Sequence, residues 1–140
     1  MENLKWFHED KVAFVKISSP PVNALSSKLL QELSEVFDEI ERNQEVRVVL
    51  IYGDGKFFSA GADIKEFIET EPGDGFTKLS KFGQNLMEKI EDFPKPVIAA
   101  IHGAALGGGL ELAMACHFRL VTEGAKLGLP ELSLGLIPGF

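Results

Sequence analysis

Apolar residues that recur three or four positions apart predict two amphipathic helices. The first begins at about Ser26, and either Ser26 or Ser27 can cap it. Its apolar stripe consists of Leu29, Leu30, Leu33, Val36, Phe37 and Ile40. The second runs from about Gly75 to Phe93, and Pro94 follows it. Proline has no backbone N–H and cannot continue a helix, so the second helix has a defined end.

Short runs of β-branched and aromatic residues predict the strands. Val12 to Ile17 forms one such run and ends at a Ser-Ser-Pro-Pro loop. Val48 to Tyr52 is apolar without alternation, which predicts a strand covered on both faces. Val97 to Ile101 predicts a second buried strand, and Phe118 to Val121 a third one after a short helix. A strand, an amphipathic helix and a buried strand in this order indicate a βαβ unit, so the predicted fold class is α/β with parallel pairing.

Composition and charge exclude several classes of protein. The chain has 140 residues, enough for one domain or part of one. It carries 14 basic and 21 acidic residues, and the net charge of −7 argues against a nucleic-acid or anionic-membrane partner. Cys116 is the single cysteine, so an internal disulfide is impossible and no cysteine pattern suggests zinc. No apolar run approaches the roughly 18 residues of a membrane span, and no secretory signal is visible. We therefore expect a cytoplasmic protein.

The printed sequence ends in an apolar, turn-like segment, Leu136 to Phe140. Domain termini normally lie at the surface, and an apolar end leaves side chains that further residues would cover. We therefore expect residues 1–140 to be part of a single domain that is interrupted after Phe140.

Three segments could carry chemistry, and the first is rich in small residues. Phe57 to Phe67 follows a buried strand, and its small side chains around Gly61 leave backbone N–H groups accessible to a ligand. A structural explanation competes, because Asp63 and Glu66 have the spacing of a helix capping box. Ser59 lies in Phe-Ser-Ala-Gly, which differs from the G-x-S-x-G nucleophile elbow and disfavours a serine hydrolase.

The second segment, Ile101 to Leu112, is a glycine-rich turn between a strand and a helix. Such a turn directs unpaired N–H groups towards the space beyond the strand end. No Lys-Ser or Lys-Thr follows, and Leu112 occupies the last glycine position of a G-x-G-x-x-G fingerprint, so mononucleotide and dinucleotide binding are disfavoured. Glu111 in the first helical turn either interacts with the helix dipole or serves as an acid or base.

The third segment, Lys126 to Gly139, contains one carboxylate, Glu131, in an apolar loop. Apolar surroundings disfavour the charged form of a carboxyl group, so its pKa rises. A pKa closer to neutral makes the group a better acid or base at physiological pH. The alternative is an ordinary solvated glutamate.

Together and in this order, the three segments resemble the crotonase family, also called the enoyl-CoA hydratase/isomerase superfamily. The resemblance extends from the first strand to Phe140. The residues that carry it are Pro20 to Leu25, Ser59 to Asp63, Gly107 to Glu111, Pro130 with Glu131, and Gly135 to Gly139. It implies a crotonase-like spiral of ββα units whose core sheets lie roughly perpendicular, and an acyl-CoA thioester as the substrate.

The resemblance also implies roles for individual residues. The backbone N–H groups of Ala62 and Gly108 would hold the thioester oxygen in an oxyanion hole. Members that hydrate use two glutamates, and Glu111 and Glu131 occupy both positions. Glu131 would be the principal acid/base, Glu111 would orient and activate the water, and the Gly139 N–H would help place substrate and water.

The coenzyme A portion of the substrate would lie near Ala60 to Lys65. Ala60, Asp63, Ile64 and Lys65 are the expected contacts, with Lys65 close to a phosphate. No metal ion and no separate redox cofactor is implied, since coenzyme A is part of the substrate. In the family, C-terminal helices complete the acyl pocket and build a homotrimer that pairs into a hexamer. Residues 1–140 correspond to the N-terminal core, and those helices are absent from it.

The leading expectation is a hydro-lyase that adds water reversibly to 2-trans-enoyl-CoA in fatty-acid β-oxidation. An enoyl-CoA isomerase of the same family, which can work with one carboxylate, remains an alternative. So does a non-catalytic fragment that only binds acyl-CoA, in which case the chain alone would be inactive. The failed glycine fingerprint disfavours a dinucleotide-dependent oxidoreductase.

Overall fold

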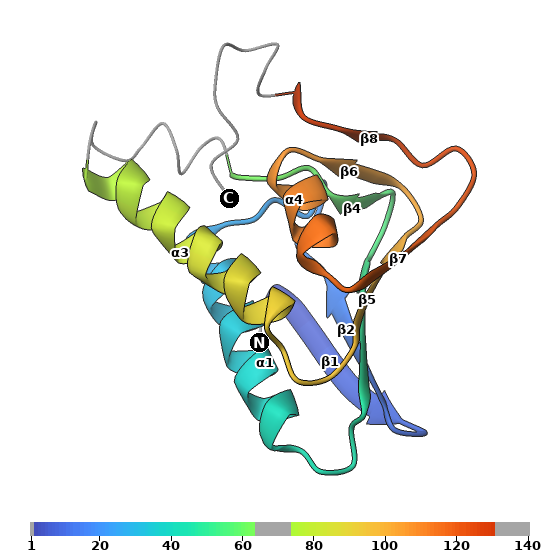
Figure 1. The fold of residues 1–140 in the computed structure, drawn as a ribbon. Coiled ribbons are helices and arrows are strands. Elements are labelled where there is room, and N and C mark those ends of the chain that lie inside the picture. Colours follow the sequence, from blue (N-terminus) through green and yellow to red (C-terminus); the bar gives the residue numbers. More distant parts are fainter. Residues whose placement is uncertain (1, 64–73, 131–140) are drawn as a thin grey trace.

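The structure is a computed structural model that describes residues 2–63 and 74–130 (Figure 1). Its larger sheet contains β1 (Leu4–Glu9), β2 (Val12–Ile17), β3 (Val48–Gly53), β5 (Val97–Ile101) and β7 (Phe118–Val121), in the order β1-β2-β3-β5-β7. Its smaller sheet contains β4 (Phe57–Ser59), β6 (Ala104–Leu106) and β8 (Leu127–Gly128), in the order β4-β6-β8. The helices are α1 (Ser27–Arg42), α3 (Asp74–Glu91) and α4 (Gly108–Ala115). Within the described residues, no helix is both long and apolar enough to cross a membrane.

The pairing confirms the predicted α/β class. β1 and β2 form an antiparallel pair, whereas β2–β3, β3–β5 and β5–β7 are all parallel. Within the described residues, two strands followed by a helix recur three times, as β1-β2-α1, β3-β4-α3 and β5-β6-α4. This is the repeated ββα unit that the family resemblance implies.

Helix α1 begins where the sequence predicts and buries the face that its periodicity predicts. The Ser26 side chain caps it by accepting a hydrogen bond from the Leu29 N–H at 3.1 Å. At the other end, the Lys95 Nζ donates to the carbonyl oxygens of Ile40 and Asn43 at 2.6 and 2.8 Å. The Ile40 carbonyl also accepts from the N–H of the C-cap residue Asn43 at 3.1 Å. The lysine therefore adds a charged donor at the helix end where the dipole favours positive charge.

The core lies where α1 and α3 pack against each other and against the larger sheet. The Phe37 and Phe93 rings meet edge to face with centroids 5.0 Å apart. Such geometry is favourable because the positive ring edge meets the negative ring face. The Lys89 Nζ adds a polar link by donating to the carbonyl oxygen and the hydroxyl of Ser34, at 3.0 and 3.1 Å.

Three expectations about burial in the larger sheet are wrong in whole or in part. β5, predicted as a second buried strand, has Ile98 and Ala100 only half-buried. Val49 and Ile51 in β3 are fully buried, but Val48, Leu50 and Tyr52 on the opposite face are only half-buried. The prediction that β3 is covered on both faces therefore holds for one face. The strand β7 was expected to be buried, yet all four of its side chains are exposed. It lies at the edge of the sheet, where it has a strand neighbour on one side only among the described residues.

The core contact predicts a large difference between two phenylalanines of the same chain. Phe37 has no exposed surface, whereas Phe7 is 53% exposed and stacks on Phe14. Phe37→Ala should lower the free energy of unfolding by about 3–5 kcal/mol, because it leaves a cavity. Phe7→Ala should cost less than about 1 kcal/mol. Urea unfolding of both variants is the measurement, and similar losses would contradict this assignment of the core.

Candidate functional site

The three segments singled out in the sequence each contain one strand of the smaller sheet. β4 ends at Ser59 and leads into the small residues, β6 ends at Leu106 and leads into the glycines, and β8 ends at Gly128, just before Pro130. β4–β6 and β6–β8 are parallel pairs. Because the carboxyl ends of parallel strands lie at one edge of a sheet, β4, β6 and β8 all end at the same edge (Figure 1).

The first segment is a turn, residues 59–62, held by four hydrogen bonds. The buried Ser59 hydroxyl donates to the Asn23 carbonyl oxygen at 2.7 Å and accepts from the Gly61 N–H at 3.1 Å. The Ala60 N–H donates to the Val22 carbonyl at 2.9 Å, and the Gly61 carbonyl accepts from the Leu25 N–H at 2.7 Å. Gly61 has φ +97°, a conformation that favours glycine. The backbone on both sides of Ala60 is therefore fixed.

The second segment is the beginning of α4. Gly107 is its N-cap at φ 54° with no side chain to cap the helix, and Gly108 is its first residue. The Gly107 N–H donates to the Gly128 carbonyl at 2.9 Å, which joins this turn to β8. The first N–H groups of a helix have no partner within the helix, and the helix dipole makes this end favourable for negative charge. The predicted glycine-rich turn between a strand and a helix is confirmed, and Gly108 is the first residue of that helix.

The two segments touch through their backbones. A Cβ added to Gly61 would lie 2.9 Å from the Gly108 nitrogen and 2.8 Å from the Leu106 carbonyl oxygen. A Cβ added to Gly109 would lie 2.1 Å from the Ser59 carbonyl oxygen. Only glycine permits such an approach at both positions. The structure therefore brings Gly108 beside the turn that contains Ala62.

The remaining predicted residues divide into described and undescribed ones. Ala60, Ala62 and Asp63 are half-buried, in or directly after the turn. Glu111 is half-buried in the first turn of α4, three residues after Gly108, so both lie on the same side of the helix. Four predicted residues lie outside the described part of the chain: Ile64, Lys65, Glu131 and Gly139.

Two polar residues at this site were missed by sequence reasoning. Ser59 has no exposed surface and Asn23 has 1%. The Asn23 Nδ2 donates to the carbonyl oxygens of Asp54 and Phe57 at 2.9 and 2.8 Å, and its Oδ1 accepts from the Ser19 N–H at 2.9 Å. Asn23 also has a positive φ of 55°. Each of the two residues is a small polar residue in an otherwise apolar stretch of sequence. That pattern could have identified them, because a polar side chain buried among apolar residues needs hydrogen-bond partners.

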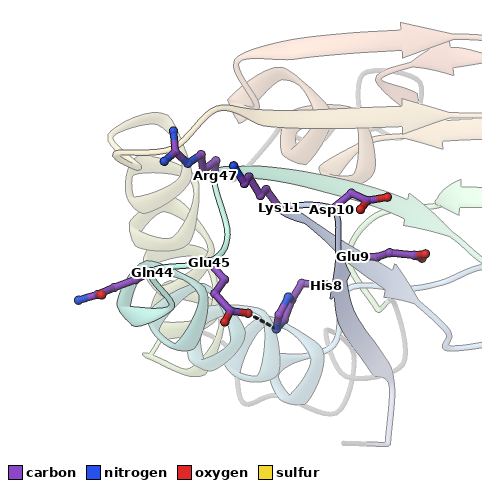
Figure 2. Close-up of a pocket in the computed structure, with 7 residues that line it drawn as sticks. All are labelled: His8, Glu9, Asp10, Lys11, Gln44, Glu45 and Arg47. Atoms are coloured by element: carbon purple, nitrogen blue, oxygen red, sulfur yellow. Dashed lines mark ion pairs between the residues drawn. The ribbon is translucent and has the colours of Figure 1, made fainter.

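A surface pocket elsewhere contains none of the predicted site residues. It lies at the β1–β2 turn and the connection from α1 to β3, where β2 and β3 begin (Figure 2). Its lining consists of His8, Glu9, Asp10, Lys11, Gln44, Glu45 and Arg47. Both signs of charge are present, and the His8 Nε2 lies 3.9 Å from a Glu45 carboxylate oxygen. Within the described ranges, no group of three or more histidine, cysteine or acidic residues could hold a metal ion.

Cys116 is a buried thiol at the end of α4. Its Sγ donates to the Leu112 carbonyl oxygen at 3.4 Å, and the side chain is buried. Burial raises the pKa of the Cys116 thiol to about 12, and the nearby Arg119 charge opposes this only in part. A thiolate nucleophile is therefore disfavoured at this position.

Comparison with known proteins gives a consistent result. The sequence profile of the family described as enoyl-CoA hydratase/isomerase matches residues 8–140. The "Probable enoyl-CoA hydratase" of Bacillus subtilis is 62% identical over 129 residues, which are 92% of this chain and 50% of that protein. The "Peroxisomal fatty acid beta-oxidation multifunctional protein AIM1" of Arabidopsis thaliana is 44% identical over 132 residues, 94% of this chain and 18% of that protein.

Solved structures agree with the sequence relatives. The crystal structure of an enoyl-CoA hydratase from Bacillus anthracis superposes with a TM-score of 0.93 at 39% identity. The match covers 98% of this chain and 54% of that one. The chain therefore spans about half the length of the hydratases that it matches, and the fold of that half is common to them.

The backbone contact predicts different costs for alanine at two glycines with similar φ angles. Gly61 and Gly124 have φ +97° and +85°, but nothing lies within 4 Å of a Cβ at Gly124. Gly124→Ala should lower the free energy of unfolding by about 1–2 kcal/mol through backbone strain alone. Gly61→Ala should cost at least about 1 kcal/mol more, because its Cβ also collides with Leu106 and Gly108. Equal losses in urea unfolding would contradict the contact.

The raised pKa predicts that Cys116 resists labelling in the folded chain. At pH 8 its thiolate fraction should be about a thousandfold below that of an exposed cysteine, since the two pKa values differ by about three units. A thiol reagent such as DTNB should release little chromophore from the folded chain and one equivalent after urea is added. Rapid labelling without urea would contradict the buried position.

Proposed function

Since the chain belongs to the enoyl-CoA hydratase/isomerase family, we propose that it serves the reversible addition of water to 2-trans-enoyl-CoA thioesters, giving 3-hydroxyacyl-CoA. The observation that carries the proposal is the backbone contact between the 59–62 turn and the first turn of α4. The Arabidopsis relative, whose name includes fatty acid β-oxidation, supports breakdown of fatty acids as the setting.

The thioester oxygen is the group that this contact would bind. We assign its two donors to the backbone N–H groups of Ala62 and Gly108. During the reaction the carbonyl gains enolate character, so fixed donors bind the transition state more strongly than the ground state. Gly108 begins α4, where the dipole adds to the attraction. Loss of one such donor typically costs about 3–4 kcal/mol of barrier.

The water would be handled by two carboxyl groups, Glu111 and Glu131. Glu131 takes a proton from the water, and the water oxygen bonds to C3 of the substrate. The C2–C3 π electrons move towards the thioester oxygen. As the C=O bond re-forms, C2 takes the proton back from the Glu131 carboxylic acid, so that one water has been added and Glu131 is again a carboxylate. Glu111 orients and activates the water, and the Gly139 N–H helps to place it. Two neighbouring carboxyl groups do not both ionise easily, which favours one shared proton.

Substrate binding would continue along the residues that follow the turn. We assign coenzyme A contacts to Ala60, Asp63, Ile64 and Lys65, with the Lys65 ammonium near a phosphate. The chemistry proposed here uses neither a metal ion nor a redox cofactor. We further propose that the full-length protein forms a homotrimer or a hexamer of two trimers.

The proposal predicts that the Glu111 carboxylate is needed and that a surface glutamate is not. Purified chain mixed with crotonyl-CoA should consume the conjugated enoyl thioester, followed by its ultraviolet absorbance, and yield 3-hydroxybutyryl-CoA. Glu111→Gln should lower the rate by about 10²- to 10⁴-fold, the usual contribution of acid/base catalysis. Glu123→Gln, the same change in an exposed turn, should leave the rate unchanged.

The other outcomes separate the alternatives. Formation of a conjugated thioester from a 3-enoyl-CoA, without hydration of crotonyl-CoA, would identify an isomerase and contradict the hydratase. Binding of crotonyl-CoA by calorimetry, with no conversion in either assay, would identify an acyl-CoA-binding chain. Equal rates for Glu111→Gln and Glu123→Gln would remove Glu111 from the mechanism.

A further inference from the structure

Ser59 stands between two parts of the chain that must keep a fixed relation at the site. Its hydroxyl donates to the Asn23 carbonyl oxygen at 2.7 Å and accepts from the Gly61 N–H at 3.1 Å. The residue has no exposed surface, so water cannot replace either bond. One oxygen atom therefore connects the residue before Ala24 with the backbone that leads into Ala62.

The Asn23 end of this connection is itself held firmly. Its amide donates to the carbonyl oxygens of Asp54 and Phe57, one on each side of the turn between β3 and β4. The Asn23 N–H adds a bond to the Ser19 carbonyl oxygen at 2.8 Å. Because these bonds fix Asn23 on several sides, its carbonyl oxygen is a rigid acceptor for the Ser59 hydroxyl.

The hydrogen bond from the Gly61 N–H to the Ser59 hydroxyl affects the site directly. The Gly61 N–H belongs to the peptide just before the Gly61–Ala62 peptide, whose N–H is the Ala62 donor assigned above. Gly61 also approaches the Gly108 nitrogen, so a rotation of its backbone would change the relation between Ala62 and Gly108. A hydroxyl that fixes Gly61 thus controls whether two donors converge on one oxygen.

We propose that Ser59 is a positioning residue: its hydroxyl orients the 60–62 backbone so that the Ala62 and Gly108 N–H groups polarise the same thioester oxygen. This inference rests on the proposed function. Ser59 touches no reacting atom and acts only through Gly61. Its removal should therefore weaken polarisation of the carbonyl while leaving the coenzyme A contacts largely in place.

The test measures the carbonyl directly and needs no turnover. Crotonyl-CoA labelled with ¹³C at the thioester carbonyl is bound to the chain, and isotope-edited infrared difference spectra give the shift of its C=O stretch. Strong hydrogen bonds lower this frequency. The variants are Ser59→Ala, Ser59→Cys, which keeps a weaker donor and acceptor of similar shape, and Ser18→Ala. Ser18 provides the matched control, since its hydroxyl bonds the exposed Asp54 carboxylate at 3.2 Å.

We expect Ser59→Ala to lose about half or more of the downshift, Ser59→Cys to retain an intermediate part of it and Ser18→Ala to retain all of it. The dissociation constant of crotonyl-CoA should change less than about threefold, because most of the contacts are made by coenzyme A. Where hydration is measurable, kcat of Ser59→Ala should fall at least about tenfold with little change in KM.

The outcomes distinguish failure of the proposed function from failure of the positioning role of Ser59. No binding of crotonyl-CoA by the unsubstituted chain overturns the proposed function, and the role of Ser59 with it. A full downshift in Ser59→Ala, with binding intact, overturns the role of Ser59 alone. If circular dichroism shows Ser59→Ala to be unfolded, Ser59→Cys decides: an intermediate downshift supports positioning, and a full one contradicts it.

Discussion

The close approach of two backbones, one leaving β4 and one beginning α4, is the constraint on which the site depends. At Gly109 there is no room for a Cβ, because the Ser59 carbonyl oxygen would lie 2.1 Å away. At Gly61 the obstacle is the Leu106 carbonyl oxygen together with the Gly108 nitrogen. Glycine at both positions replaces side-chain packing by backbone packing. A donor formed by the backbone is positioned by the fold as a whole, and no side-chain rotamer has to be ordered for it.

The long elements could be predicted from sequence because their own residues determine them. Leu33, Phe37 and Ile40 are fully buried on α1, as their spacing predicts. The strands β4, β6 and β8 could not be predicted, since they have two or three residues each and are defined by their partners. β6 lies within the stretch that the sequence predicts to be a glycine-rich turn. The burial of β7 was misjudged because apolar composition predicts a strand but not what covers it.

The candidate site divides along the same line. Glycine placement predicted a helix N-terminus at Gly108, since local backbone geometry is what glycine determines. Ser59 and Asn23 were missed because their partners are remote: the Ser59 hydroxyl and the Asn23 carbonyl are 36 positions apart along the chain. A lone serine in an apolar motif has no visible function until the fold supplies an acceptor for its proton. The positioning role of Ser59 is supported by its two hydrogen bonds, which the sequence motif does not show.

Strand order explains why three weak signals combine into one site. Each of the segments has an ordinary explanation when taken alone, such as a capping box after Ala62 or a dipole partner at Glu111. The smaller sheet brings the three segments together, because β4, β6 and β8 are parallel neighbours and their carboxyl ends lie at the same edge. Each strand belongs to a successive unit of the chain, so one segment per unit reaches that edge. A change that shifted β6 in register would therefore displace Gly108 relative to both other segments at once, although no residue of the site had been altered.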